Sequence, residues 1–185
     1  MEIILASGSP RRRELLNTLG LRFTVCPAKG EETAPEGAGP AEIVKALSRA
    51  KAGEVARQFA GELIIAADTI VYLDGRVLGK PHDEEDARQM LRTLSGRTHE
   101  VITGVTLLTT QFRRSFACTT RVTFASLTEE EIEFYVSHYR PMDKAGSYGV
   151  QEWIGYIGVT SIEGSFYNVM GLPIQRLYTE LKNIK

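Results

Sequence analysis

The first motif that could do chemistry lies near the start of the chain. Residues 5–14 read Leu-Ala-Ser-Gly-Ser-Pro-Arg-Arg-Arg-Glu, and Ser9 followed by proline favours the start of a helix. Arg11, Arg12 and Arg13 then occupy the first helical turn, where the helix dipole ordinarily favours acidic side chains. An anion bound between the arginines would account for them, and arginine binds phosphate in a bidentate manner. The alternative is a solvated basic patch.

Asp68 is the second candidate, because it follows Leu63–Ala67, the most apolar run of the chain. That run predicts a buried strand that ends at residue 67. A carboxylate at its end is costly to bury unless it is paired or binds a metal, and α/β proteins bind ligands at the carboxyl ends of their strands. We therefore expect a metal ligand or a general base; the alternative is an aspartate that caps a turn.

Three further polar residues stand where a ligand could use them. Lys80 lies between a glycine and a proline, which indicates a defined loop. Lys51 shares a predicted helix face with apolar residues, and Gln151 ends the glycine-rich segment 143–151, where its amide could read a base edge. The alternatives are a surface lysine for Lys80 and, for Lys51, a side chain that extends along the helix to solvent.

Together these motifs combine cations able to bind phosphate with one or two carboxylates, without a Ser–His or Cys–His arrangement for nucleophilic catalysis. Metal-assisted attack of water on a nucleotide phosphate suits that combination. Mg²⁺ or Mn²⁺ is commonly bound by one or two carboxylates together with substrate phosphates. The three histidines lack the mutual spacing of metal ligands, and we expect them to be structural or surface residues.

Alternating strands and helices must position these residues, which predicts an α/β protein. The expected strands cover residues 3–6, 21–25, 63–67, 70–73, 76–78, 101–108, 115–125 and 153–162. The expected helices cover residues 10–19, 41–59, 84–95, 128–139 and 173–181. Asp74-Gly75 indicates a tight hairpin turn between two of the strands, and Thr128 with Glu131 indicates a capping box.

The composition is that of an ordinary globular chain of 185 residues, with 43% hydrophobic and 24% charged residues. The size predicts a single domain over residues 1–185, or at most two small lobes. A net charge of −1 argues against binding to nucleic acid, and no apolar run approaches the roughly 20 residues of a membrane helix. Residues 1–13 carry their charges after the apolar stretch, the reverse of a signal peptide, and Cys26 and Cys118 show no CxxC pattern. We expect a cytoplasmic protein with reduced thiols.

The chain resembles the Maf family of nucleoside triphosphate pyrophosphatases over nearly its whole length. Six motifs in the family's order carry the resemblance: residues 5–12, 67–71, 78–81, 95–101, 143–151 and 164–173. The family implies a Maf/ITPase-like α/β fold, in which helices flank an elongated, bent, mixed sheet and two lobes surround a central cleft. It also implies hydrolysis between the α and β phosphates to a nucleoside monophosphate and pyrophosphate, with Mg²⁺ or Mn²⁺, in a protein that is often a homodimer.

The resemblance implies roles for individual residues. Asp68 matches the family's catalytic proton acceptor and a metal ligand, and Glu32 matches an acidic position near the metal. The positions expected to hold phosphates are Ser7, Arg12, Lys51 and Lys80. Those associated with substrate choice are Arg11, Thr69 and Gln151. The surroundings of Gln151 resemble the subfamily that acts on dTTP and UTP rather than on 7-methyl-GTP.

The segment 152–158 departs from the family, because Trp153 and Tyr156 stand where its members have small, glycine-rich stretches. We expect these two larger side chains to alter the rim of the cleft or a dimer contact. Such enzymes resemble house-cleaning pyrophosphatases that remove modified pyrimidine nucleotides such as pseudo-UTP. Two alternatives stay open. A non-catalytic nucleotide-binding regulator of cell division would bind without turnover, and a phosphomonoesterase would release orthophosphate.

Overall fold

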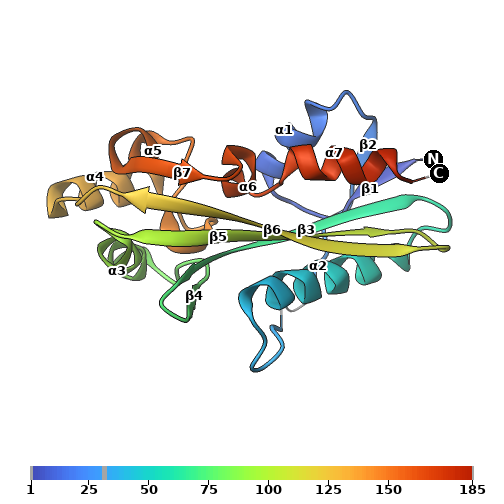
Figure 1. Cartoon of the computed structure of the whole chain (residues 1–185), viewed down its shortest axis with the longest axis horizontal. Coiled ribbons are helices and arrows are strands. Elements are labelled where there is room, and N and C mark those ends of the chain that lie inside the picture. Colours follow the sequence, from blue (N-terminus) through green and yellow to red (C-terminus); the bar gives the residue numbers. More distant parts are fainter. Residues whose placement is uncertain (1, 31–32, 185) are drawn as a thin grey trace. The chain divides into compact units, whose positions relative to one another are not determined.

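The computed structural model describes residues 2–30 and 33–184, and Figure 1 shows their elements. Within these residues, seven strands form one sheet in the order β2-β1-β3-β5-β6-β7, with β4 paired to β3. β1 pairs in parallel with β2 and β3, whereas β4 is antiparallel to β3 and β7 is antiparallel to β6. The predicted mixed α/β sheet with flanking helices is confirmed.

The bounds of the elements are as follows. The strands are β1 (Ile3–Leu5), β2 (Phe23–Val25), β3 (Leu63–Leu73), β4 (Arg76–Leu78), β5 (Thr98–Leu108), β6 (Arg113–Phe124) and β7 (Val159–Glu163). The helices are α1 (Pro10–Asn17), α2 (Pro40–Ala56), α3 (Glu84–Leu94), α4 (Glu129–Tyr139), the 3₁₀ helix η1 (Ala145–Ser147), α5 (Trp153–Gly158), α6 (Phe166–Met170) and α7 (Ile174–Lys182). None of these described helices is long and apolar enough to cross a bilayer.

The chain divides into two compact units, which alternate along the sequence. Unit 1 comprises Met1–Thr69, Thr103–Cys118 and Gly171–Lys185, and holds β1, β2, α1, α2 and α7. Unit 2 comprises Ile70–Ile102 and Thr119–Met170, and holds β4, β7 and α3 to α6. The boundary falls inside β3, β5 and β6, so each unit contains its own part of these strands.

In unit 1, α2 lies on one face of the sheet and α7 on the other (Figure 1). Ala52 and Val55 of α2 pack with Ile4 of β1 and Ile64 of β3 in a buried apolar cluster, as the predicted stripe of α2 requires. The start of α1 also follows the prediction, because the Ser9 hydroxyl accepts a hydrogen bond from a backbone N–H of the first turn.

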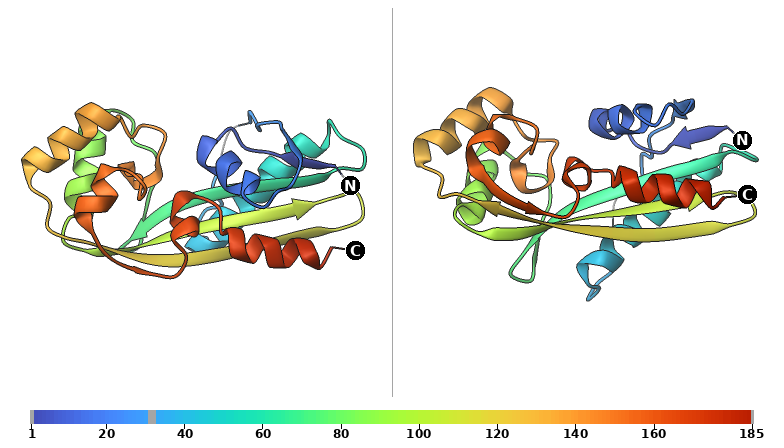
Figure 2. Two further views of the ribbon diagram at one scale, coloured as in Figure 1. Left: turned by 90° about the horizontal axis from the view of Figure 1, so that it is seen from above. Right: turned by 45° about the horizontal axis from the view of Figure 1, so that its top comes forward.

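In unit 2, α3 and α4 lie side by side (Figure 2). Leu91 of α3 and Tyr135 of α4 belong to the same buried core. The predicted caps are present: Asp83 accepts from the third backbone N–H of α3, and Thr128 forms the capping box of α4 with Glu131. The Asp-Gly turn between β3 and β4 has positive φ at both residues, as a type I′ turn requires.

The prediction of a strand over residues 153–162 is wrong for its first half, which forms α5. Aromatic and β-branched residues there favour a strand by propensity. However, a Cβ at Gly155 would lie 1.9 Å from the Val150 carbonyl oxygen, so the glycine allows α5 to pack directly on the preceding turn. This packing overrides the propensity. The expected helices also leave out residues 166–170, which form α6.

The predicted end of a strand at residue 67 is wrong as well, since β3 continues to Leu73. Ile70, Val71 and Leu73 are buried and extend the apolar character of the strand past its polar interruption. Asp68 and Thr69 therefore lie inside a strand, and the carboxylate is not at a strand end.

Candidate functional site

The buried carboxylate of unit 1 belongs to Asp68, which is 6% exposed. Lys51 of α2 contacts it, and its Nζ donates to Asp68 Oδ1 at 2.6 Å. Burial of a carboxylate is tolerated when a cation and hydrogen bonds replace the lost water. The alternative in which Lys51 extends along the helix to solvent is therefore wrong, and the structure pairs two residues that the sequence singled out separately.

A close approach of α2 to β5 sets the position of Lys51. A Cβ at Gly104 of β5 would lie 2.4 Å from the carbonyl carbon and oxygen of Val44, so α2 packs directly on the strand backbone. One helical turn further, Ser48 Oγ hydrogen-bonds Thr106 Oγ1 at 2.8 Å, and Lys51 follows after about one more turn. We did not identify Gly104 from the sequence, although a glycine inside a strand is a known signal of close backbone approach.

Arg12 of α1 joins three segments of unit 1 through its guanidinium. Its Nε donates to the Gly171 carbonyl oxygen at 2.8 Å, Nη2 to Thr69 Oγ1 at 2.9 Å, and Nη1 to Ser7 Oγ at 3.3 Å. Thr69 Oγ1 also hydrogen-bonds Thr103 Oγ1 at 2.9 Å. The structure thus brings together Ser7, Arg12 and Thr69, as a shared site requires. Thr103 was missed, and a threonine inside an apolar strand gave no signal for it.

The loop between β1 and α1 links the arginines to the strand. Ser7 is nearly buried, and its hydroxyl accepts from the Ser9 N–H at 3.3 Å as well as from Arg12. Arg11 is half-buried and Arg13 is exposed. The three arginines of the motif therefore differ in their exposure, and Arg12 is directed to neighbouring segments of unit 1.

The Asp68–Lys51 pair and the residues bonded to Arg12 both lie beyond the carboxyl end of β1. β1 ends at Leu5, which pairs with Ile65 of β3. Asp68 and Thr69 follow further along β3, and successive strand residues point to opposite sides. This alternation explains why their partners come from different helices, α2 and α1. The rule that ligands bind past the carboxyl ends of strands therefore points to β1 rather than to β3.

The two remaining site candidates belong to unit 2. Lys80 is exposed in the loop after β4, and Gln151 is half-buried. The Gly146 N–H donates to the Gly79 carbonyl oxygen at 3.0 Å, which connects the loop of Lys80 to the segment of Gln151. Among the described residues, Gln151 Oε1 is buried and has no hydrogen-bond partner. A buried amide oxygen of this kind is suited to accept a hydrogen bond from a ligand.

The side chains that could bind a metal ion are few in the described residues. Within residues 2–30 and 33–184, no three His, Cys, Asp or Glu side chains are grouped so that they could hold a metal ion. Glu32, expected near the metal, lies outside the described residues. Asp68 offers one buried carboxylate next to the cationic Lys51. Such a donor set fits Mg²⁺ or Mn²⁺ that shares its ligands with substrate phosphates, and not a metal held by protein alone.

Comparison with known proteins gives a consistent result along the whole chain. The family model described as Maf-like protein matches residues 2–184. A protein of Phocaeicola vulgatus named dTTP/UTP pyrophosphatase is 58% identical over 185 residues, which cover 99% of this chain and 96% of the relative. A protein of Bacteroides thetaiotaomicron with the same name is 56% identical over 185 residues, with the same two coverages.

Among solved structures, the Ham1 protein of Staphylococcus aureus has a similar fold. The two chains cover each other over 100% of both lengths, with a TM-score of 0.59 and 18% sequence identity. At that identity the likeness concerns the fold, and it agrees with the mixed sheet and flanking helices described above.

Proposed function

Because the chain belongs to the Maf family, we propose that it hydrolyses dTTP and UTP to the nucleoside monophosphate and pyrophosphate. One observation carries the proposal most directly. Asp68 and Thr69, consecutive residues of β3, carry a buried Asp68–Lys51 pair and the Arg12 cluster (Ser7, Arg12 and Thr69), both past the end of β1. The full-length relatives named dTTP/UTP pyrophosphatase support the substrate class. The modified forms of the same pyrimidine nucleotides are part of the proposed substrate range.

The phosphates of the substrate bind to the cations and hydroxyls of this site. Arg12 presents a planar set of donors that matches phosphate oxygens, and the Ser7 hydroxyl is already hydrogen-bonded to it. Lys51 supplies a point charge to these phosphates, and Lys80 is a further phosphate-binding residue of the proposal. Arg11, Thr69 and Gln151 determine which nucleotide is accepted, and Gln151 contacts the base through its buried amide oxygen.

Asp68 acts as the proton acceptor for the attacking water. The water oxygen bonds to the α-phosphorus. The bond from the α-phosphorus to the bridging oxygen breaks, and pyrophosphate leaves with that oxygen. Asp68 and Glu32 are the residues that would hold Mg²⁺ or Mn²⁺ together with the phosphates. When bound, the metal neutralises phosphate charge and makes the water more acidic. Lys51 fixes the orientation of the Asp68 carboxylate through its 2.6 Å contact.

Product analysis tests this function. We expect monophosphate and pyrophosphate from dTTP and UTP with Mg²⁺ or Mn²⁺, and slower turnover of CTP and GTP. Asp68→Asn should lower the rate at least about 100-fold, because a positioned general base contributes that much. Asp74→Asn, the same change in the exposed hairpin turn, is the matched control and should leave the rate unchanged.

Four results would contradict the proposal or one of its parts. A preference for GTP would refute the role given to Gln151, and release of orthophosphate would identify a phosphomonoesterase. Binding of nucleotide without any turnover would support the alternative, a regulator of cell division. Full activity of Asp68→Asn would refute the role of that carboxylate.

The assembly and place of action form part of the same proposal. The protein acts in the cytoplasm as a homodimer, and one family model across both units supports treating residues 1–185 as a single functional domain. Unit 2 exposes four large hydrophobic side chains: Tyr156 and Ile157 of α5, and Phe166 and Tyr167 of α6. Their exposure supports a surface of unit 2 that a second copy would cover. Light scattering of wild type and Tyr156→Ser measures the mass; a monomeric wild type would refute the dimer.

A further inference from the structure

Gln151 stands in a tight turn of unit 2. The backbone N–H of Glu152 donates to the Gly149 carbonyl oxygen at 3.0 Å, so Gly149, Val150, Gln151 and Glu152 form one β-turn. Gln151 is the third residue of this turn. Its amide oxygen lacks a hydrogen-bond partner among the described residues, so no hydrogen bond to that oxygen fixes the amide. The position of the amide therefore depends on the turn.

Tyr135 of α4 contacts both ends of that turn with a single hydroxyl. The Gly149 N–H donates to Tyr135 Oη at 3.0 Å, and the hydroxyl donates to Glu152 Oε2. Tyr135 is fully buried in the core between α3 and α4. Burial and the neighbouring Glu152 carboxylate raise the pKa of Tyr135, so the phenol keeps its proton and remains a donor.

The surrounding side chains hold Glu152 in the same place. Its Oε1 lies 3.1 Å from Nζ of Lys144, a nearly buried lysine that also contacts Asp143 at 2.8 Å. A Cβ at Gly149 would lie 2.9 Å from the Glu152 carboxyl carbon and 3.0 Å from Lys144 Cε. Each end of the turn thus has a hydrogen bond or a close contact. The partners are Tyr135 of α4 and Lys144, which precedes the turn.

We infer that Tyr135 is a positioning residue for Gln151, and that its hydroxyl fixes the depth at which the Gln151 amide meets the base. This inference rests on the proposed function. An amide can both donate and accept, so its chemistry alone does not exclude a purine. The position at which the turn holds the amide excludes a larger base. A loosened turn would let the amide move and admit that base. Tyr135 touches neither substrate nor metal in this proposal.

Tyr135→Phe is the variant that tests the inference, because it removes the hydroxyl and keeps the buried ring. We expect the ratio of kcat/KM for UTP to that for GTP to fall about tenfold, the loss that one hydrogen bond of about 1.4 kcal/mol would give. The fall should come from a higher KM for UTP together with a lower KM for GTP, with kcat little changed. Tyr139→Phe, on the exposed part of the same helix, is the matched control and should keep the wild-type ratio.

A binding measurement keeps the test independent of turnover. Titration calorimetry with UMP and GMP gives the same selectivity as a ratio of dissociation constants. A wild type that releases no pyrophosphate would refute the proposed function, while the UMP to GMP ratio would still decide the inference. An unchanged ratio in folded Tyr135→Phe, an equal loss for both nucleotides, or a wild type without preference would each overturn it.

Glu152 provides a second pair of variants in case Tyr135→Phe does not fold. Glu152→Gln retains an oxygen that can accept from the Tyr135 hydroxyl, and it should keep most of the selectivity. Glu152→Ala removes that acceptor and should lose selectivity to the same extent as Tyr135→Phe. Equal selectivity in the two Glu152 variants would overturn the inference.

Discussion

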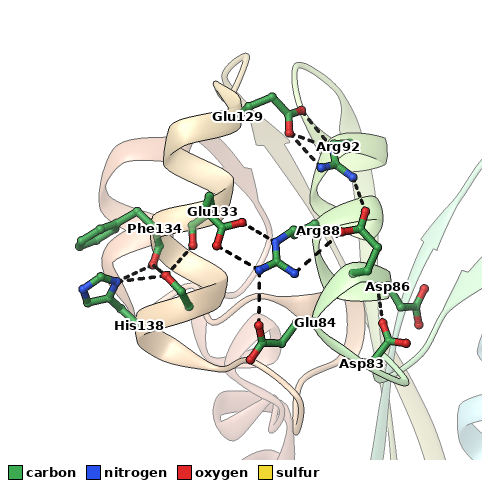
Figure 3. A network of polar contacts seen from close by, with 11 residues as sticks. Asp83, Glu84, Asp86, Arg88, Arg92, Glu129, Glu133, Phe134 and His138 are labelled. Atoms are coloured by element: carbon green, nitrogen blue, oxygen red, sulfur yellow. Dashed lines mark hydrogen bonds and ion pairs between the residues drawn. The ribbon is translucent and has the colours of Figure 1, made fainter.

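Two sets of ion pairs in this molecule differ in how much water reaches them. In unit 1, Lys51 and Asp68 have side chains that are only 16% and 9% exposed. In unit 2, Arg88 and Arg92 of α3 pair with Glu133 and Glu129 of α4, whose side chains are 57% and 66% exposed (Figure 3). The chemical partners are alike, a cation and a carboxylate, but their surroundings are not.

The difference determines what each set does. An exposed pair gains little, because water and salt screen the attraction and each carboxylate has solvent as an alternative partner. A buried pair is mutually dependent, since removal of one charge leaves the other without compensation in a poorly hydrated place. The α3–α4 pairs therefore align two helices, whereas the Lys51–Asp68 pair holds a carboxylate where stability alone would not place one.

The sharpest way to break the comparison is Lys51→Met, which leaves Asp68 buried without its cation. We expect the free energy of unfolding to fall by about 3–5 kcal/mol, the usual cost of breaking a buried pair. Pyrophosphate release should fall as well, because the carboxylate loses the contact that orients it. Urea unfolding and an assay of pyrophosphate measure the two effects.

Lys45→Met on the same helix is the matched control, since Lys45 pairs with the exposed Glu42. It should change neither stability nor activity appreciably. The double variant Lys51→Met with Asp68→Leu should recover much of the lost stability but none of the activity. Wild-type stability of the single Lys51→Met variant would show that the pair is no more coupled than the exposed ones.

The buried pair also depends on the close packing of α2, which Gly104→Ala tests. The added methyl group would lie 2.4 Å from backbone atoms of Val44, so α2 must move and Lys51 must move with it. We expect a loss of about 2–3 kcal/mol in stability and a clear loss of activity. Gly53→Ala on α2 is the control: open space surrounds a Cβ there, and alanine should stabilise the helix by up to about 1 kcal/mol. Similar behaviour of the two variants would refute the close approach.

These residues also show what a sequence can predict here. The caps of α1, α3 and α4 and the Asp-Gly turn were predictable, because each depends on residues next to one another in the chain. The candidate site residues were found by residue type and by resemblance. The partner of Lys51 was not predictable, because Asp68 lies on a distant strand and the contact requires α2 to pack on Gly104. The helix α5 was missed for the same reason, since a contact between Gly155 and Val150 decides it.

His99 sharpens the comparison, because it is a buried group with no charged partner among the described residues. It lies in β5 of unit 2, with Nε2 at 2.7 Å from the Tyr148 hydroxyl, and burial lowers its pKa from 6.5 to about 4. The folded state therefore keeps His99 neutral, while the unfolded chain takes up a proton below pH 6.5. Stability from this residue is complete above that pH and is lost as the pH falls toward 4, by about 2 kcal/mol between pH 7 and 5. Urea unfolding across this range should show a smaller loss for His99→Gln, and equal slopes would contradict the assignment.

The smallest effect belongs to the exposed pairs, which Arg88→Met tests. The Arg88 guanidinium lowers the pKa of Glu133 from its ordinary value of 4.5, chiefly through their hydrogen bond. A lowered carboxylate pKa adds stability above pH 4.5 that is lost as the pH falls through the folded-state pKa. Because the Glu133 side chain is 57% exposed to water, we expect only a slight decrease in the unfolding temperature at neutral pH, which high salt should remove, and unchanged pyrophosphate release. A large decrease that persists in high salt would mean that the α3–α4 pairs behave like the buried pair of unit 1, and that exposure is not what separates the two sets.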